Sequence, residues 1–258
     1  MPLLRNVAPP ALALAVLLAL WEGLAFALSI PLFLLPPPSD IALAAVKSAE
    51  ILALAALTTT QAALTGFGLS AAIGVLVAVI LASSRSLERA FYPYTVFLQT
   101  VPIVAVAPLL VIWFGAGIRA VTVSAFIVSV FPVIANTLAG LRSVEPPLRD
   151  LFRLYGAGRL ATLLKLEIPS ALPNIVTGLR VASGLSVIGA IVGEFVAGYS
   201  EGAAGLGILV LSSYRQLRTD LLFAAVLSAS ALGLSLFGAI NLAGYLLLRR
   251  WHPSERGH

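Results

Sequence analysis

Residues 140–172 read GLRSVEPPLRDLFRLYGAGRLATLLKLEIPSAL and form the only sizeable polar island in an otherwise apolar chain. From Arg142 onward this island holds five of the sixteen Lys and Arg residues and three of the eleven Asp and Glu residues. Its larger apolar residues recur at helical spacing and so share one face of a predicted helix: Leu148, Leu151, Phe152 and Tyr155. Gly156 permits the positive φ that ends such a helix, and Pro169 is expected to stop a second, shorter helix.

The predicted helix-turn-helix is too small to bury its own leucines, so it must lie against something else. A groove on a partner protein would cover its apolar face, and so would the surface of a membrane. Its five basic residues suit anionic lipid as well as protein, which leaves both alternatives open at the level of residue patterns.

The composition of the whole chain indicates an integral membrane protein of the all-α class. Of 258 residues, 60% are hydrophobic and 10% are charged, whereas about a quarter of a soluble domain is charged. The net charge of +5 is carried by short connecting loops, which favours a role in topology over nucleic-acid binding. The absence of cysteine excludes disulfides, thiol catalysis and thiolate metal sites.

Six apolar runs are near the roughly 20 residues that a helix needs to cross the bilayer. They are residues 11–30, 59–82, 91–114, 121–141, 173–198 and 221–248. The prolines at 35–40 (LPPPSD) separate the first run from a helical segment through Glu50, which we place partly at the outer surface. The chain thus divides into a first membrane helix with this outer segment (1–52), a main membrane domain (53–248) and a polar tail (249–258), with a second outer loop at 200–220.

The distribution of basic residues predicts the orientation of these spans. With the N-terminus inside, eleven Lys and Arg residues lie on the cytoplasmic side and four on the outer side, and Arg180 lies within a span. This bias places both termini and the polar island in the cytoplasm.

Prolines and polar residues inside the spans indicate candidate sites within the membrane. The third span has three prolines, and a span broken in this way either lines a pathway or is a kinked packing helix. Glu194 must face protein or water, as a gate or as a structural hydrogen-bond acceptor. The candidate pathway or gate residues are Gln99, Pro102, Pro108, Asn136 and Glu194. Gly189 and Gly193 form a GxxxG pair, which we interpret as the seam of a dimer.

The sequence contains no recognisable catalytic motif. A P-loop places glycine before its lysine, but Val46 precedes Lys47 and Leu164 precedes Lys165, so ATP hydrolysis is expected from a separate subunit. Both histidines lie in the tail, so no catalytic residue, metal site or cofactor is predicted. The alternative to weigh is a proton-coupled secondary transporter that uses Glu22 and Glu194.

The polar island resembles the EAA signature, E-A-A-x3-G-x9-I-x-L-P, of permeases of ATP-binding-cassette (ABC) importers. Gly156 and Pro169 match and every spacing is kept, while Asp150 replaces the glutamate and Leu151 and Phe152 replace the two alanines. Residues 99–102 (QTVP) and 112–115 (IWFG) are similar to the third-helix segments of the nitrate, sulfonate and taurine branch. The resemblance covers roughly residues 53–248.

This resemblance implies a six-helix, type I importer domain whose polar island is a cytoplasmic coupling helix between spans four and five. The residues implied to couple to the ATPase are Asp150, Leu151, Phe152, Tyr155, Gly156, Leu166, Ile168 and Pro169. The implied partners are a second copy of the chain, two cytoplasmic ABC ATPase subunits, an extracytoplasmic solute-binding protein and membrane lipid, in a bacterial plasma (inner) membrane. The implied solute belongs to the nitrate, sulfonate and taurine class, or is a vitamin precursor such as a thiamine pyrimidine or riboflavin.

Overall fold

The computed structural model describes residues 2–197 and 204–248, and this part of the chain is helical throughout apart from its connections. Its elements are α1 (Pro2–Ala27), α2 (Pro38–Lys47), α3 (Ala49–Ala82), α4 (Arg85–Thr100), α5 (Ile103–Phe114), α6 (Ile118–Arg142), α7 (Pro146–Leu154), α8 (Arg159–Thr162), η1 (Leu163–Glu167), α9 (Ile168–Ala197), α10 (Leu206–Arg215) and α11 (Thr219–Leu248). Five helical stretches are long and apolar enough to cross a membrane, and the bent pair α4–α5 supplies a sixth if its two helices form one span. The all-α membrane fold is thereby confirmed.

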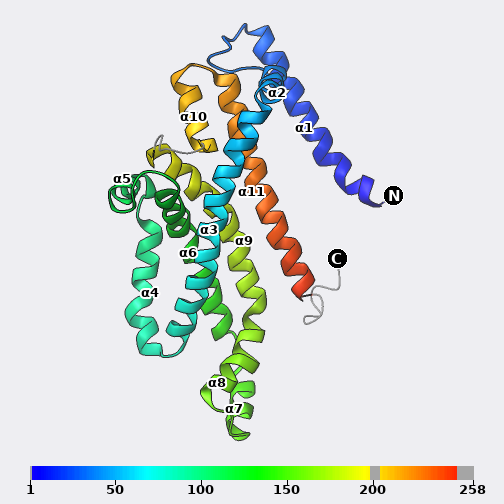
Figure 1. Cartoon of the computed structure of the whole chain (residues 1–258). Coiled ribbons are helices and arrows are strands. Elements are labelled where there is room, and N and C mark those ends of the chain that lie inside the picture. Colours follow the sequence, from blue (N-terminus) through cyan, green and yellow to red (C-terminus); the bar gives the residue numbers. More distant parts are fainter. Residues whose placement is uncertain (1, 198–203, 249–258) are drawn as a thin grey trace.

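Helices α3, α6 and α9 pack together as the centre of the bundle, with α6 in contact with both of the others (Figure 1). Small residues allow this approach. A Cβ added at Gly189 would lie 2.8 Å from Cα of Ala125, and one added at Gly178 would lie 2.9 Å from the carbonyl oxygen of Pro132. The Ser124 hydroxyl also donates to the carbonyl of Gly189 at 2.7 Å. We call this contact the α6–α9 seam.

The α6–α9 seam corrects the prediction that Gly189 and Gly193 form a dimer interface. Both glycines are buried against α6 of the same chain, since a Cβ at Gly193 would lie 3.0 Å from Cα of Val121. The GxxxG pattern correctly indicates close helix packing, but it does not say which helix is the partner.

The third predicted span is broken, as its prolines indicate. Helices α4 and α5 meet at an angle of 97° around Val101 and Pro102, and Pro102 directly precedes the first turn of α5. After α5 the chain turns through two glycines with positive φ, Gly115 (80°) and Gly117 (113°), before α6 begins.

Pro169 does not stop the helix that precedes it, so that prediction was wrong. The chain runs from α8 through one π-helical turn, η1, directly into α9, giving a continuous stretch of 39 residues, Arg159–Ala197. The N–H of Ile168 donates to the carbonyl of Leu163, five residues earlier. This wider turn accommodates the proline ring, which would clash within a regular α-helical turn.

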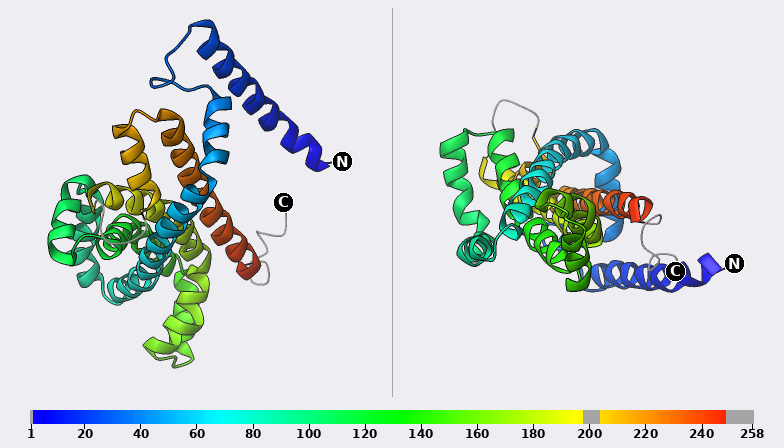
Figure 2. Two further views of the ribbon diagram at one scale, coloured as in Figure 1. Left: turned by 45° about the horizontal axis from the view of Figure 1, so that its top comes forward. Right: turned by 90° about the horizontal axis from the view of Figure 1, so that it is seen from below.

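The remaining elements lie around this centre and at its two ends. Helices α2 and α10 lie at one end of the bundle, and α7 and α8 project from the other (Figure 1). Helix α1 leans away from the bundle in every view and has its main contact with α2 (Figure 2). Most of its apolar side chains are exposed, including Leu12, Leu17 and Leu20. Such a surface needs lipid or another protein to cover it.

Candidate functional site

The loop of residues 143–167, here called the α6–α9 loop, contains a short helix with well-defined ends. Pro146 and Pro147 occupy the first positions of α7, where a missing N–H costs nothing. At the other end Gly156 has φ +68°, its N–H donates to the carbonyl of Arg153, and the N–H of Ala157 donates to that of Phe152. This pair of bonds is a Schellman motif, and it confirms the predicted turn at Gly156.

The α6–α9 loop carries large apolar side chains into the solvent. Leu151 of α7 is 44% exposed, whereas Leu154 and Tyr155 at its end are 85% and 83% exposed. Leu148 and Leu160 are exposed as well. Because the segment projects beyond the helix bundle (Figure 1), no other described part of the chain covers these side chains. A cluster of this kind is typical of a surface that docks a partner.

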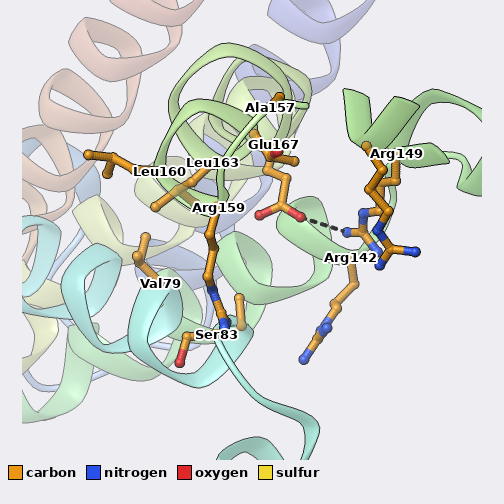
Figure 3. A pocket seen from close by; sticks show the side chains of 12 residues that line it. Val79, Ser83, Arg142, Arg149, Ala157, Arg159, Leu160, Leu163 and Glu167 are labelled. Atoms are coloured by element: carbon orange, nitrogen blue, oxygen red, sulfur yellow. Dashed lines mark ion pairs between the residues drawn. The ribbon is translucent and has the colours of Figure 1, made fainter. Parts of the chain in front are cut away.

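Two ion pairs hold the base of this exposed loop. Arg149 of α7 lies 3.3 Å from Glu167 of η1 and also donates to the carbonyl of Leu141 at 2.7 Å (Figure 3). Arg142 at the end of α6 pairs with Glu88 of α4 at 2.5 Å. All four side chains are partly buried, with exposed fractions between 22% and 32%. Arg149 therefore ties α7 to η1 and to the end of α6, and Arg142 ties the end of α6 to α4, while the tip of the loop stays free.

The structure divides the predicted coupling residues into two groups. Leu151 and Tyr155 lie on the exposed tip, and Asp150 is exposed beside Arg153 of the same helix. Phe152, Ile168 and Pro169 are partly buried, and Leu166 is buried, so these four stabilise the loop and its junction with α9. Sequence reasoning missed Leu154, although its spacing of three residues from Leu151 placed it on the same helix face.

Glu194 binds the start of a neighbouring helix at the opposite end of the bundle. Its carboxylate accepts hydrogen bonds from the hydroxyl of Thr59 (α3) at 2.8 Å and from the N–H of Gly207 (α10) at 2.6 Å. The N–H of Leu206 in turn donates to the Thr59 hydroxyl at 2.9 Å. A Cβ at Gly205 would overlap the carboxylate, so a larger residue there would have to displace Glu194 from these hydrogen bonds. The buried acid thus joins α3, α9 and α10, which supports the structural alternative.

Glu22 makes a similar contact at the start of α2. Its two oxygens accept from the backbone N–H of Ser39 at 3.0 Å and from the Ser39 hydroxyl at 2.6 Å. The two carboxylates that a proton-coupled transporter would use are therefore each engaged at the positive end of a short helix.

The other candidate pathway residues do not converge. Gln99, Pro102 and Pro108 are exposed on the bent pair α4–α5, whereas Asn136 lies in the α6–α9 seam and donates to the carbonyl of Pro132 at 2.8 Å. A pathway lined by these residues needs a second wall, which the described part of a single chain does not supply.

Comparisons with known proteins agree with one another. Residues 70–253 match a family described as binding-protein-dependent transport system inner membrane component. The formylaminopyrimidine transport permease protein ThiX of Halalkalibacterium halodurans is 35% identical over 93% of this chain and 94% of its own length. The riboflavin transport system permease protein RibX of Chloroflexus aurantiacus is 36% identical over 95% and 92%.

The fold of this chain is also similar to that of a chain in a solved structure. An inward-facing structure of the MetNI methionine ABC transporter includes a chain with a TM-score of 0.64 to this one, at 19% identity, covering 79% of this chain and 97% of that chain. At this level of identity the likeness concerns the fold alone.

Proposed function

The chain belongs to the family of binding-protein-dependent transport system inner membrane components, and we propose which subunits drive it with ATP, that it pairs with a second copy of itself, and which class of solute it carries. It is the transmembrane permease subunit of an ABC importer. We propose that two separate cytoplasmic ATPase subunits hydrolyse the ATP and that each binds one α6–α9 loop.

The exposed tip of the α6–α9 loop is the observation that carries this proposal. Leu154 and Tyr155 are more than four-fifths exposed although they lie on a loop that is held at its base by ion pairs. Burying two such side chains contributes about 1.5–3 kcal/mol each, enough for them to anchor a docked subunit. In the permeases that carry the EAA signature, the coupling helix lies at the position of this loop.

The continuity of the chain suggests how movement reaches the membrane. Arg149 of α7 pairs with Glu167, which lies within the continuous helical stretch Arg159–Ala197, so a displacement of α7 is transmitted to α9. The α6–α9 seam makes α6 follow, because its interlocked small residues leave no space for sliding. At the far end Glu194 links α9 to α10, so the outer end of the bundle shifts as well. ATP binding turns the pathway outward, and hydrolysis resets it.

A second copy of the chain completes the pathway. Helix α1 is nearly uncovered by its own chain, and the exposed face of α4–α5 carries Gln99, Pro102 and Pro108. Pairing two copies would cover apolar surface of α1 and give the pathway its second wall. With two loops, the dimer binds two ATPases, and one extracytoplasmic solute-binding protein delivers the solute. The assembly sits in a bacterial plasma membrane with both termini of each chain in the cytoplasm.

We propose a nitrogen heteroaromatic vitamin precursor as the solute. ThiX and RibX are named for a formylaminopyrimidine and for riboflavin, and each matches more than nine-tenths of the present chain. The test is a thermal shift of the purified solute-binding protein that delivers the solute to this permease. Riboflavin or formylaminopyrimidine should raise its Tm, because a ligand that binds the native state alone stabilises it. A shift with taurine or nitrate alone would reject this class.

Docking is tested by co-purification of the permease with its ATPase. Leu154→Asp introduces a charge at the centre of the apolar tip and should remove the ATPase from the purified complex. Arg153→Ala is the matched control, because Arg153 is the adjacent residue on α7 and is similarly exposed. Retention of the ATPase by Leu154→Asp would contradict the docking proposal.

A further inference from the structure

A cavity of about 710 Å³ lies behind the α6–α9 loop, where that loop meets the end of α3 (Figure 3). Val79 and Ala82 of α3 form an apolar wall on the side of the membrane helices. Leu160 and Leu163 extend this apolar surface on the loop side. Leu154 and Tyr155 are not among the residues that line the cavity, although Leu160 belongs both to this lining and to the exposed surface of the loop.

Arginines line the polar side of this cavity, which we call the arginine cavity. Four of them contribute from α6, α7 and α8: Arg142, Arg149, Arg153 and Arg159. Glu167 is the one carboxylate among its lining residues. Figure 3 shows Arg149 paired with Glu167 at one side and Arg159 directed toward Ser83 at the other. The lining residues alone have a formal charge of +3, and counting Glu88 and Asp150, which pair with Arg142 and Arg153, sets four arginines against three carboxylates and leaves a net charge of +1. This positive balance favours an anionic occupant.

The ion pairs leave donors of these arginines unused. The Nε atoms of Arg142 and Arg149 are buried and have no hydrogen-bond partner in the described part of the chain. Arg153 pairs with Asp150 at 3.4 Å on an exposed surface, where such a pair contributes little. Arg159 has no carboxylate partner among residues 2–197 and 204–248. Guanidinium groups arranged in this way suit the oxygens of a phosphate group.

The position of the arginine cavity along the bundle indicates which molecule supplies the phosphate group. The cavity lies where α3 ends at Ala82 and α6 ends at Arg142, which is the boundary between the apolar spans and the polar loop. Headgroup phosphates of the adjacent leaflet occupy this level, and basic pockets at the cytoplasmic ends of membrane helices bind anionic headgroups. The apolar wall of Val79 and Ala82 would accompany the glycerol and acyl part of a lipid.

We propose that the arginine cavity binds the phosphate group of an anionic phospholipid from the leaflet at this end of the bundle. A phosphate between Arg142 of α6 and Arg159 of the loop would fasten the loop to the bundle, so lipid composition would regulate how firmly the loop follows the ATPase. That this leaflet is the cytoplasmic one rests on the proposed function; the binding itself does not.

The test measures lipid retention by the purified full-length permease without any ATPase, using native mass spectrometry. Phosphatidylglycerol should be retained about tenfold more strongly than phosphatidylcholine, and Arg159→Gln should remove about tenfold, because a charge-assisted hydrogen bond to phosphate has this strength. Arg218→Gln, at the other end of the bundle beside α11, is the matched control and should change nothing. Tm of each variant establishes that it is folded.

Further arms of the experiment separate the sources of phosphate. Displacement of the retained lipid by inorganic phosphate would mean that the phosphate site is filled from solution, and it would overturn a lipid as the source. Equal retention of both lipids together with no effect of inorganic phosphate would overturn the proposal. So would loss of the ATPase, rather than of lipid, from Arg159→Gln in the assembled transporter, since the arginines would then serve an acidic protein surface. Because lipid is measured on the permease alone, a failed docking experiment leaves this result untouched.

Discussion

The α6–α9 seam and the α6–α9 loop involve the same two helices but follow opposite rules. In the seam, Gly178 and Gly189 are buried so closely against α6 that a Cβ would overlap backbone atoms. In the loop, Leu154 and Tyr155 are almost fully exposed, and a Cβ at Gly156 would meet no atom within 4 Å. The seam has its partner within the chain, whereas the proposed partner of the loop lies outside it.

The largest expected effect comes from adding volume to the seam. Gly189→Leu should prevent accumulation of folded protein, because the new side chain must displace the α6 backbone near Ala125, at a cost of 3 kcal/mol or more, as in severe overpacking. The measurement is the yield and Tm of monodisperse protein in detergent. Gly184→Leu, on the same helix with open space around its Cβ, should behave as the wild type. Equal yields of both variants would place the seam elsewhere.

A smaller and more local effect is expected in the loop. Gly156→Val forces a β-branched residue to φ +68°, at a cost of roughly 1–2 kcal/mol, and should disrupt the turn after α7 without unfolding the bundle. Solute-stimulated ATP hydrolysis and uptake in membrane vesicles should fall together. Gly158→Val is the control, since Gly158 has an ordinary φ of −67° and space around it. Normal stimulated activity of Gly156→Val would show that the turn is not needed for coupling.

The smallest effect concerns Glu194, whose buried carboxylate joins α9 to the start of α10. Glu194→Gln keeps an acceptor for Thr59 or Gly207 but loses the charge at the start of α10, which should cost about 1 kcal/mol. Hydrogen exchange at the amides of Leu206 and Gly207 should accelerate, whereas exchange in α6 should not. Glu22 makes the more exposed contact with α2, so Glu22→Gln should accelerate hydrogen exchange at the amide of Ser39 less than Glu194→Gln accelerates it at Gly207. If Glu194→Gln abolished transport while hydrogen exchange at Leu206 and Gly207 stayed unchanged, Glu194 would instead act as a gate.

Hydropathy and turn residues predicted most of this fold, because a span and a positive-φ glycine are local properties. The positions of the long helices, the break at Pro102 and the turn at Gly156 follow from short stretches of sequence. Which helix fills a GxxxG face is not local, so Gly189 and Gly193 were given the wrong partner. Pro169 was misjudged because a π-helical turn, which has no simple residue signature, accommodates it.

The candidate site was predicted only in part, because its location depends on local sequence whereas the exposure of its side chains depends on the fold. The motif spacing located the loop, but only the fold shows that Leu166 is buried while Leu154 is exposed. The hydrogen bond from Gly207 to Glu194 joins residues separated by a turn whose course the sequence does not indicate. The arginine cavity gathers residues from the ends of α3 and α6 and from the loop, so no linear pattern predicts it.

Cysteine labelling at the loop tip reports which side of the membrane the loop faces and whether the ATPase covers it, and the sequence contains no cysteine that would interfere. Tyr155→Cys should react with a membrane-impermeant maleimide only after the cells are opened, and bound ATPase should then slow the reaction. Labelling from the outside of intact cells would put the loop on the wrong face of the membrane, and an unchanged rate with ATPase bound would mean that the motor docks elsewhere.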